Sequence, residues 1–330
     1  MSKSYRVVGI GNAIVDILSH IEDQFLIDNG VERGIMQLID MDRARELYGK
    51  MGPAKEISGG SAANTIAGIA ALGQKTAYVG KVRDDQLGDI FAHDIRAQGA
   101  DYDTPRASGG SHETGRCMVL VSPDGERSMN TYLGVSEFLT PADIDEDLMA
   151  DTDWTYLEGY RFDGPDSHAA FAKANAACRN AGGRVSITLS DPFCVERHRD
   201  AFRRMIRDDI DLLFANEHEM RAMYQMDDLD AALATAAGEV DIVACTIGER
   251  GAIVMKDGVR TEAPATTVRM VDATGAGDMF AAGFLYGLTS GHDMARCGRM
   301  GCVAAGEIIG HIGARPEADL MALFREDGLV

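Results

Sequence analysis

The chain has 330 residues, of which 45% are hydrophobic, and a formal net charge of −20 from 32 Lys and Arg against 52 Asp and Glu. Such an acidic chain is a poor partner for nucleic acid or an anionic membrane surface, and no apolar run approaches the ~20 residues that span a bilayer. The N-terminal residues lack the pattern of a signal peptide, and the six cysteines form no C-x-x-C pair. We therefore expect one large α/β domain over residues 1–330, cytoplasmic, with free thiols and a small-molecule ligand.

The first predicted strand covers Tyr5–Ile10, where apolar residues run into a glycine turn. Gly9 to Ile14 imitates the G-x-G-x-x-G fingerprint of dinucleotide-binding proteins, but Ile14 replaces the third glycine. A dinucleotide-dependent oxidoreductase would depend on this turn alone. Asp16 follows in the apolar stretch IVDIL. A carboxylate there needs a partner, so it is either a turn or cap acid or an acceptor for the hydroxyls of a polar ligand.

A second glycine turn, Gly59-Gly60, leads into a small-residue helix predicted over Ala62–Leu72. Ser61 is a good N-cap residue, and Ser61 and Asn64 share one helix face because they are three residues apart. The two are either a capping pair beside a tightly packed helix or a binding surface. In the second case, a hydroxyl-rich ligand would lie on the glycines and bond to Asn64.

Two β-like runs, Thr114–Val121 and Glu126–Leu133, flank the turn Ser-Pro-Asp-Gly and predict a hairpin. Arg116 and Arg127 lie on this hairpin. Each is either a solvent-exposed charge or a group that faces a bound anion.

From Asp153 onward, predicted strands and helices alternate. The strands are Trp154–Leu157, Val185–Leu189, Asp211–Ala215, Ile242–Thr246 and Ala252–Met255, with Ala77–Gly80 earlier in the chain. The helices are Ser167–Ala181, Glu196–Arg207, Glu217–Tyr224 and Leu229–Ala237, preceded by Asp42–Met51, for which Asp42 would be the N-cap, and by Gln86–Ala97. This alternation predicts a mostly parallel sheet with helices on both faces, and ligands of such sheets bind at the carboxyl ends of the strands.

Polar groups follow two of these strands. Asn216 and Glu219 have the spacing of a capping box, and they could instead organise a hydrated Mg²⁺ ion. After the next strand, Thr246, Gly248 and Gly251 suit either the phosphate and ribose of a nucleotide or a plain turn.

The stretch from Asp272 to Asp278 reads DATGAGD and opens an apolar helix predicted over Met279–Leu288. Glycines allow a close approach of the backbone, and the N–H groups and dipole of a helix start attract negative charge. The turn therefore predicts an anion site. Asp278 is either an ordinary helix-start acid or a base beside a bound phosphate, and the helix dipole should lower its pKa.

Several known catalytic patterns are missing from the sequence. It contains no G-x-x-x-x-G-K-[ST] loop, no protein-kinase H-R-D or D-F-G motif, no G-x-S-x-G elbow and no H-E-x-x-H pair.

Taken together in order and spacing, these motifs resemble the pfkB family of ribokinase-like carbohydrate and nucleoside kinases. The resemblance covers nearly the whole chain and is most specific at DATGAGD, although Ala273 stands where the family usually has Thr or Ser. Three segments look more like adenosine kinase than ribokinase: Gly11–Ile17, Leu189–Phe193 and Ile308–Pro316.

The resemblance implies a doubly wound α/β domain with a small β-sheet lid drawn from about residues 13–38 and 102–133. It implies ATP-dependent phosphorylation of an alcohol, with one lid arginine, Arg116 or Arg127, helping to stabilise charge. The implied catalytic set is Asp278 as base, with the backbone N–H groups of Gly275, Ala276 and Gly277 around the transferring phosphoryl group. The implied substrate set is Asn12, Asp16, Gly59, Gly60 and Asn64.

The implied nucleotide set is Asn216, Thr246, Gly248 and Gly251, with Glu219 organising Mg²⁺ through water. Related kinases also use K⁺, which would lie near Asp272 and Thr274.

The leading hypothesis is a nucleoside kinase that phosphorylates the 5′-hydroxyl of adenosine. The alternative is a sugar kinase of the same family, acting on ribose, fructose or a keto-sugar acid. A nucleoside needs an apolar slot for its base, which Met36, Leu133, Tyr160 and Phe193 could build. A non-catalytic sensor on the same scaffold would have no use for Asp278. The protein would be a monomer or a homodimer.

Overall fold

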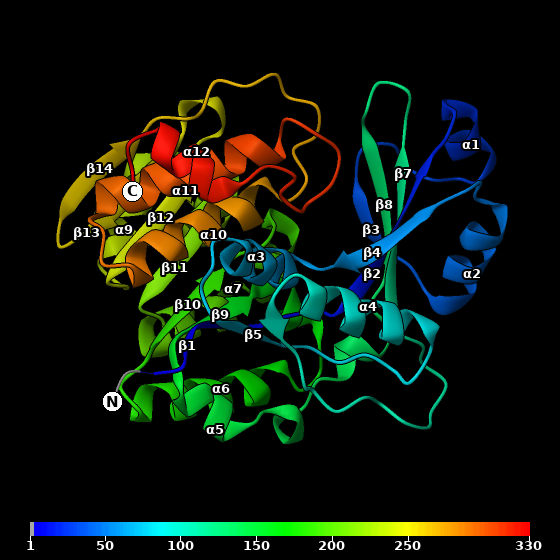
Figure 1. Ribbon diagram of the computed structural model, residues 1–330, viewed down its shortest axis with the longest axis horizontal. Coiled ribbons are helices and arrows are strands. Elements are labelled where there is room, and N and C mark those ends of the chain that lie inside the picture. Colours follow the sequence, from blue (N-terminus) through cyan, green and yellow to red (C-terminus); the bar gives the residue numbers. More distant parts are fainter. Residues whose placement is uncertain (1–2) are drawn as a thin grey trace.

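The computed structural model describes residues 3–330 and contains two β-sheets (Figure 1). The larger sheet has the order β14-β13-β12-β11-β10-β9-β1-β5-β6. Its strands are β1 Tyr5–Ile10, β5 Thr76–Val79, β6 Ala100–Asp101, β9 Thr152–Glu158, β10 Arg184–Thr188, β11 Leu212–Asn216, β12 Ile242–Thr246, β13 Ala252–Lys256 and β14 Val259–Ala263. All neighbours pair in parallel except β12–β13 and β13–β14, which are antiparallel.

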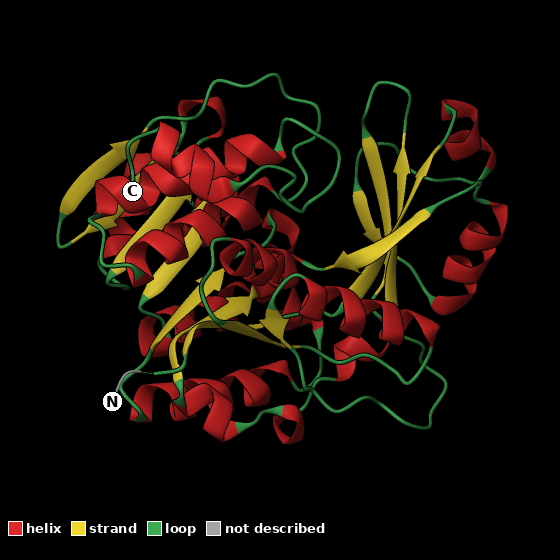
Figure 2. Cartoon of the chain, in the orientation of Figure 1, coloured by secondary structure: helices red, strands yellow, loops and turns green. Residues whose placement is uncertain are grey.

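Helices cover both faces of the larger sheet (Figure 2), so its strands are apolar on both sides, as expected for parallel strands. One face packs against α3 Ser61–Ala71, α4 Gln86–Ala97, α10 Ala276–Thr289, α11 Met294–Ile308 and α12 Leu320–Glu326. The other face packs against α5 Glu146–Ala150, α6 Ser167–Asn180, α7 Pro192–Asp209, α8 Glu217–Tyr224 and α9 Leu229–Ala237. Short 3₁₀ helices cover η1 Gly134–Phe138, η2 Pro141–Asp143, η3 Gly159–Asp163 and η4 Gly248–Arg250. The predicted α/β class with a mostly parallel sheet is confirmed.

The smaller sheet stands beside the larger one, at the right of Figure 1, and has the order β3-β8-β7-β2-β4. Its strands are β2 Ile14–His20, β3 Met36–Leu38, β4 Lys55–Gly59, β7 Gly115–Val121 and β8 Arg127–Tyr132. One of its faces packs on α1 Asp23–Asp28 and α2 Met41–Lys50, and the other face carries a second, smaller apolar cluster. Because side chains alternate between faces along a strand, β7 and β8 each contribute to both clusters.

Strand β4 lies outside the two segments expected to supply the lid, 13–38 and 102–133. Its sequence, KEISG, contains a single large apolar residue, and it pairs with β2 in antiparallel fashion. Such a strand owes its conformation to its neighbour in the sheet, so its own sequence gives little indication of it.

Four predicted helix starts were wrong. Helix α10 begins at Ala276 and not at Met279. Helix α2 is capped by Asp40, whose carboxylate accepts from the amide of Arg43, and not by Asp42. Helix α7 begins at Pro192 and not at Glu196, because Asp191 caps it and proline fits a first helical position. Ser61 is the first residue of α3 and not its cap, so its hydroxyl is free for another partner.

The alternation of strands and helices brings the carboxyl ends of the parallel strands to one edge of the larger sheet. In register there, Glu158 lies beside Thr188, and Asn216 lies beside Thr246. Within residues 3–330, none of the helices combines the length and the apolar character needed to cross a bilayer.

Candidate active site

The first turn of α10 faces the first turn of α3, and the two glycine turns meet there. Asp278 accepts two hydrogen bonds from α3: Ser61 Oγ lies 2.6 Å from Oδ1 and Asn64 Nδ2 lies 2.9 Å from Oδ2. Thr65 Oγ1 also donates to the backbone carbonyl of Asp278, over 3.2 Å. Segments more than two hundred residues apart therefore hold one carboxylate in a fixed orientation.

Burial raises the pKa of Asp278 above its ordinary value, while the hydrogen bonds from Ser61 and Asn64 and the charge of Arg315 act in the opposite direction. The expected lowering of this pKa was therefore wrong, because the desolvation of the carboxylate outweighs the contacts that favour its charged form. A higher pKa makes Asp278 a better proton acceptor.

The turn before α10 leaves backbone donors free. Among the described residues, the amides of Gly275, Gly277 and Asp278 have no protein acceptor, whereas the amide of Ala276 donates to the carbonyl of Ala273 over 3.2 Å. Gly275 has φ of 80°, and a Cβ there would lie 2.6 Å from the Cβ of Ala314. The tail segment thus packs directly behind the turn and requires glycine at this position.

Asp16, on β2, offers a carboxylate without a hydrogen-bond donor among residues 3–330. Burial raises its pKa to about 6, and Arg315 and Arg127 partly offset that rise. A Cβ on Gly59 would lie 2.4 Å from the Asp16 carboxyl group, so glycine at this position makes room for the acid. The Oδ1 of Asn64 is also buried and without a partner. These unused acceptors suit the hydroxyls of a ligand.

Asn12, by contrast, is committed to contacts within the protein. Its Nδ2 donates to Glu158 over 3.0 Å, and its Oδ1 accepts from Arg161 over 3.1 Å. Glu158 is 1% exposed and also accepts from the amide of Ala62 over 2.8 Å, which fixes the start of α3. Sequence reasoning missed Glu158 and Arg161. A polar residue at the carboxyl end of a buried strand was the available indication.

Burial raises the pKa of Glu158 to about 7, from an ordinary value of 4.5. The folded protein then holds a proton between these two values that the unfolded chain has released, so this contribution to stability is complete below pH 4.5 and is lost as pH rises to about 7. In the wild-type protein, the titration of Glu158 should lower the free energy of unfolding by on the order of 3 kcal/mol as pH rises across that range. We expect this contribution to be absent in Glu158→Gln. Urea unfolding of both proteins from pH 4.5 to 8 measures it. Identical pH slopes in the two proteins would contradict the prediction.

Arg315 joins the site from the C-terminal tail. Its guanidinium donates to the carbonyl of Ala63 over 2.7 Å and to Ser58 Oγ over 2.9 Å. Burial lowers its pKa, and the nearby carboxylates of Asp94, Asp16 and Asp278 favour its charged form. It was not predicted as a site residue, although the tail that carries it was part of the resemblance.

At the carboxyl end of β11, Asn216 and Glu219 form the capping box. Asn216 Oδ1 accepts from the amide of Glu219 over 2.8 Å, and both Glu219 oxygens accept from Asn216, over 2.6 and 2.9 Å. Burial raises the pKa of Glu219 to about 7. Within residues 3–330, no three or more His, Cys, Asp or Glu side chains gather in a metal-binding arrangement. A metal ion here would need ligands from water and substrate as well.

The turn after β12 contains two glycines, one with free space at its Cβ position and one without. Gly248 has φ of 62° and open space around its Cβ position, so a ligand can approach its backbone. Gly251 has φ of 99°, and a Cβ there would lie 2.0 Å from the carbonyl oxygen of Ala263. Gly251 is buried, so glycine is needed there for the close packing of the turn. Thr246 is the last residue of β12, directly before the turn.

The two hairpin arginines lie on opposite faces of the smaller sheet. Arg127 is on the same face as Asp16, and its NH2 lies 2.6 Å from Asp272 Oδ2. Arg116 is on the other face, where it pairs with Glu113 and lines a surface groove with Tyr48. Of the two expected lid arginines, only Arg127 therefore lies on the Asp16 face and contacts the segment that leads into α10.

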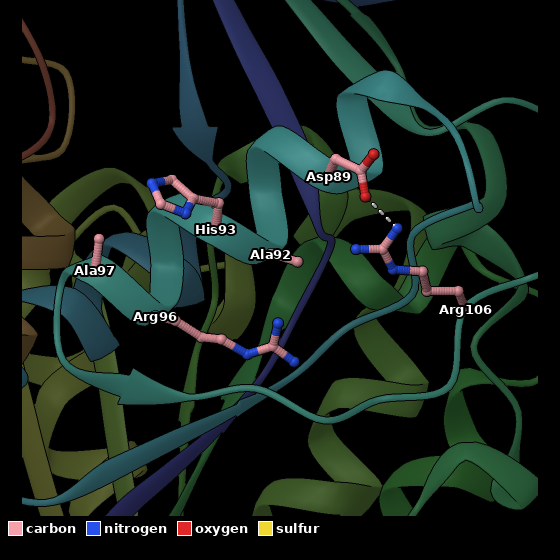
Figure 3. Close-up of a pocket in the computed structure, with 6 residues that line it drawn as sticks. All are labelled: Asp89, Ala92, His93, Arg96, Ala97 and Arg106. Carbon is pink, nitrogen blue, oxygen red and sulfur yellow. Dashed lines mark hydrogen bonds and ion pairs between the residues drawn. The ribbon is translucent and has the colours of Figure 1, made fainter.

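A surface depression outside α4 contains none of these residues (Figure 3). Its lining includes His93 and Arg96, and Arg106 there is already paired with Asp89 over 2.5 Å. The candidate site therefore remains the one around Asp278.

The Asp278 carboxylate is enclosed and lies beside the free amides at the start of α10. Asp16, on the smaller sheet, adds an acceptor for hydroxyl groups. This combination is typical of a phosphotransferase that acts on an alcohol group. The model of the pfkB family carbohydrate kinases matches residues 34–319. The chain belongs to this family, which confirms the resemblance seen in the sequence, and kinases of this family use ATP with Mg²⁺.

Similar proteins are named as both sugar and nucleoside kinases. The crystal structure of a probable sugar kinase from Rhizobium etli CFN 42 has a TM-score of 0.93 and 48% identity, covering 99% of this chain and 100% of that one. The adenosine kinase from Sinorhizobium meliloti has a TM-score of 0.92 and 46% identity, covering 98% and 99%. An ATP-dependent ribose-1-phosphate kinase from Halopiger xanaduensis is 32% identical over 277 residues, which is 82% of this chain and 87% of the relative.

Proposed function

We propose that the protein is an ATP-dependent adenosine kinase that transfers a phosphoryl group to the 5′-hydroxyl of adenosine. The observation that carries this proposal is Asp278, held by Ser61 and Asn64 next to free helix-start amides. The 46% identity to an adenosine kinase over 98% of the chain supports the choice of adenosine.

In this proposal, Asp278 takes the proton of the attacking hydroxyl. The amides of Gly275 and Gly277 donate to the developing charge of the transferred group, since neither has a protein acceptor. The amide of Ala276 contributes less than its neighbours because it already donates to Ala273. The fixed orientation of the carboxylate and amides supplies most of the catalysis, because phosphoryl transfer depends on positioning and charge stabilisation.

The substrate hydroxyls would bond to Asp16 and to the Oδ1 of Asn64, which have no donors within the described residues. Gly60 would let the sugar approach the backbone, and Gly59 keeps the space that Asp16 needs. Asn12 would act indirectly, through its contacts with Glu158.

The nucleotide would lie at the edge formed by Asn216 and Thr246, with Gly248 open to its phosphates or ribose. Mg²⁺, when bound, would neutralise phosphate charge, and Glu219 would orient it through water. Gly251 would shape the loop.

An apolar cluster on the smaller sheet supports a substrate with a base. Ile14, Cys117, Val119 and Val121 lie with partly buried Leu18 and Met129 on the same face as Asp16. A flat, apolar ring gains from such a surface, whereas the hydroxyls of a free sugar do not. The sequence analysis did not predict this cluster. It expected Phe193 to help build the slot for the base, but the side chain of Phe193 is 71% exposed.

A substrate panel tests the proposal. Purified protein is given ATP and Mg²⁺ with adenosine, ribose, fructose, ribose 1-phosphate or a keto-sugar acid, and ADP release and the phosphorylated product are measured. We expect kcat/KM for adenosine to exceed that for each sugar by at least ~10², because a sugar has no apolar ring to contact the partly buried Leu18 and Met129. Faster turnover of a free sugar or sugar phosphate would establish the alternative, a sugar kinase of the same family.

A further inference from the structure

A buried ion pair joins the two sheets at the glycine turn. The NH2 of Arg127, on β8, lies 2.6 Å from Oδ2 of Asp272, and the two side chains are 6% and 4% exposed. At the tip of the same hairpin, a Cβ on Gly125 would lie 3.4 Å from the carbonyl oxygen of Val271. The hairpin of the smaller sheet therefore rests on the segment that leads into α10.

Asp272 organises that segment. Its Oδ1 accepts from the amide of Thr274 over 3.0 Å, and its Oδ2 accepts from the amide of Gly313 over 3.3 Å. Thr274 immediately precedes Gly275, and Gly313 immediately precedes Ala314, which packs behind Gly275. The Asp272 carboxylate thus ties together both sides of the turn that carries the free amides.

A carboxylate this buried needs a positive partner. The resemblance to related kinases would place a K⁺ ion near Asp272 and Thr274, but the carboxylate already has the Arg127 guanidinium beside it and two backbone donors. Arg127 is also buried, and the acids facing it are Asp272 and the more distant Asp16.

We propose that Arg127 is a positioning residue that supplies to Asp272 the positive charge that a monovalent cation would otherwise supply, so that the kinase works without K⁺. The proposal rests on phosphoryl transfer at Asp278, as proposed above, but it does not depend on which alcohol is phosphorylated. Because the Arg127 guanidinium belongs to the smaller sheet, the position of that sheet then affects the geometry of the turn before α10.

The wild-type protein provides the first test. Its thermal midpoint and its kcat are measured in KCl and in choline chloride at equal ionic strength. We expect the midpoint to agree within about 1 °C and the rate within about twofold, because no cation needs to bind at Asp272. A rise in midpoint or rate specific to K⁺ would overturn the proposal. The melting measurement needs no substrate, so it stays decisive even if adenosine proves to be the wrong acceptor.

The second test replaces the guanidinium. Arg127→Met leaves Asp272 buried without a counter-charge, and we expect kcat to fall at least ~10-fold in choline chloride, with KM for the alcohol changed less. K⁺ should restore part of the rate and raise the midpoint of this variant only. Arg127→Lys should retain most of the rate without K⁺.

Arg116→Met is the matched control, because Arg116 is a hairpin arginine on the opposite face of the same sheet. It should show wild-type insensitivity to K⁺. If Arg127→Met loses activity but gains neither rate nor stability from K⁺, Arg127 has only a structural role and the proposal fails. If that variant does not fold, the wild-type comparison decides alone.

Discussion

Replacement of Asp278 by asparagine is expected to lower kcat by ~10² to 10⁴ while the Kd for ATP stays within about twofold, because only the proton acceptor is lost. The carboxylate is enclosed, its pKa is raised by burial, and Ser61 and Asn64 hold it in one orientation. Single-turnover rates and nucleotide binding by calorimetry measure the two quantities separately.

The variant should fold, since its new side-chain amide has a partner available. Ser61 can still donate to the remaining oxygen, and a rotated Asn64 amide can present its unpartnered Oδ1 to the new N–H group. Asp89→Asn is the matched control, because Asp89 is also a first-turn helix acid, on α4. It should leave kcat unchanged. Equal, small effects of both substitutions would make Asp278 an ordinary helix-start acid.

Gly60→Ala is expected to lower the free energy of unfolding by about 3 kcal/mol and to raise KM for the alcohol at least ~10-fold. Gly60 has φ of 101°, and a Cβ there would lie 2.2 Å from the carbonyl oxygen of Asn12. The backbone between Asn12 and Asp16 would have to move, and α3 with Ser61 would move with it. Urea unfolding and initial rates against substrate concentration measure the two effects.

The other end of α3 provides the control for backbone strain alone. Gly73 also has positive φ, 84°, but nothing lies within 4 Å of its Cβ position. Gly73→Ala should cost about 1 kcal/mol and leave KM unchanged, because strain is added without a clash. If both variants show the same KM, the Gly60 turn does not shape the substrate site.

The local sequence was sufficient for the type and order of most elements, although it misplaced the helix starts at Asp42 and Glu196. The β-to-α alternation after Asp153 predicted the parallel sheet, and the Ser-Pro-Asp-Gly turn predicted the β7–β8 hairpin. The two glycine turns predicted helix starts open to a ligand, because only glycine has the freedom that such turns need. The family followed from the same motifs, since their order and spacing are a property of the chain itself.

The partners of those motifs are a property of the fold. Strand β4 forms because β2 lies beside it, and Glu158 and Arg315 join the site through contacts across 96 and 252 residues of chain. The pairing of Arg127 with Asp272, and the exclusion of Arg116, depend on which face of the smaller sheet turns inward.

The properties of Asp278 show the same division. Its place at a helix start is local, and from that alone a lowered pKa was expected. Its enclosure by α3 is tertiary, and the burial of the carboxylate raises its pKa more than Ser61, Asn64 and Arg315 lower it. The sequence alone thus determined the class of fold and the family. The tertiary structure decided the direction of the pKa shifts of the site residues and their partners, because burial and long-range contacts exist only once the chain has folded.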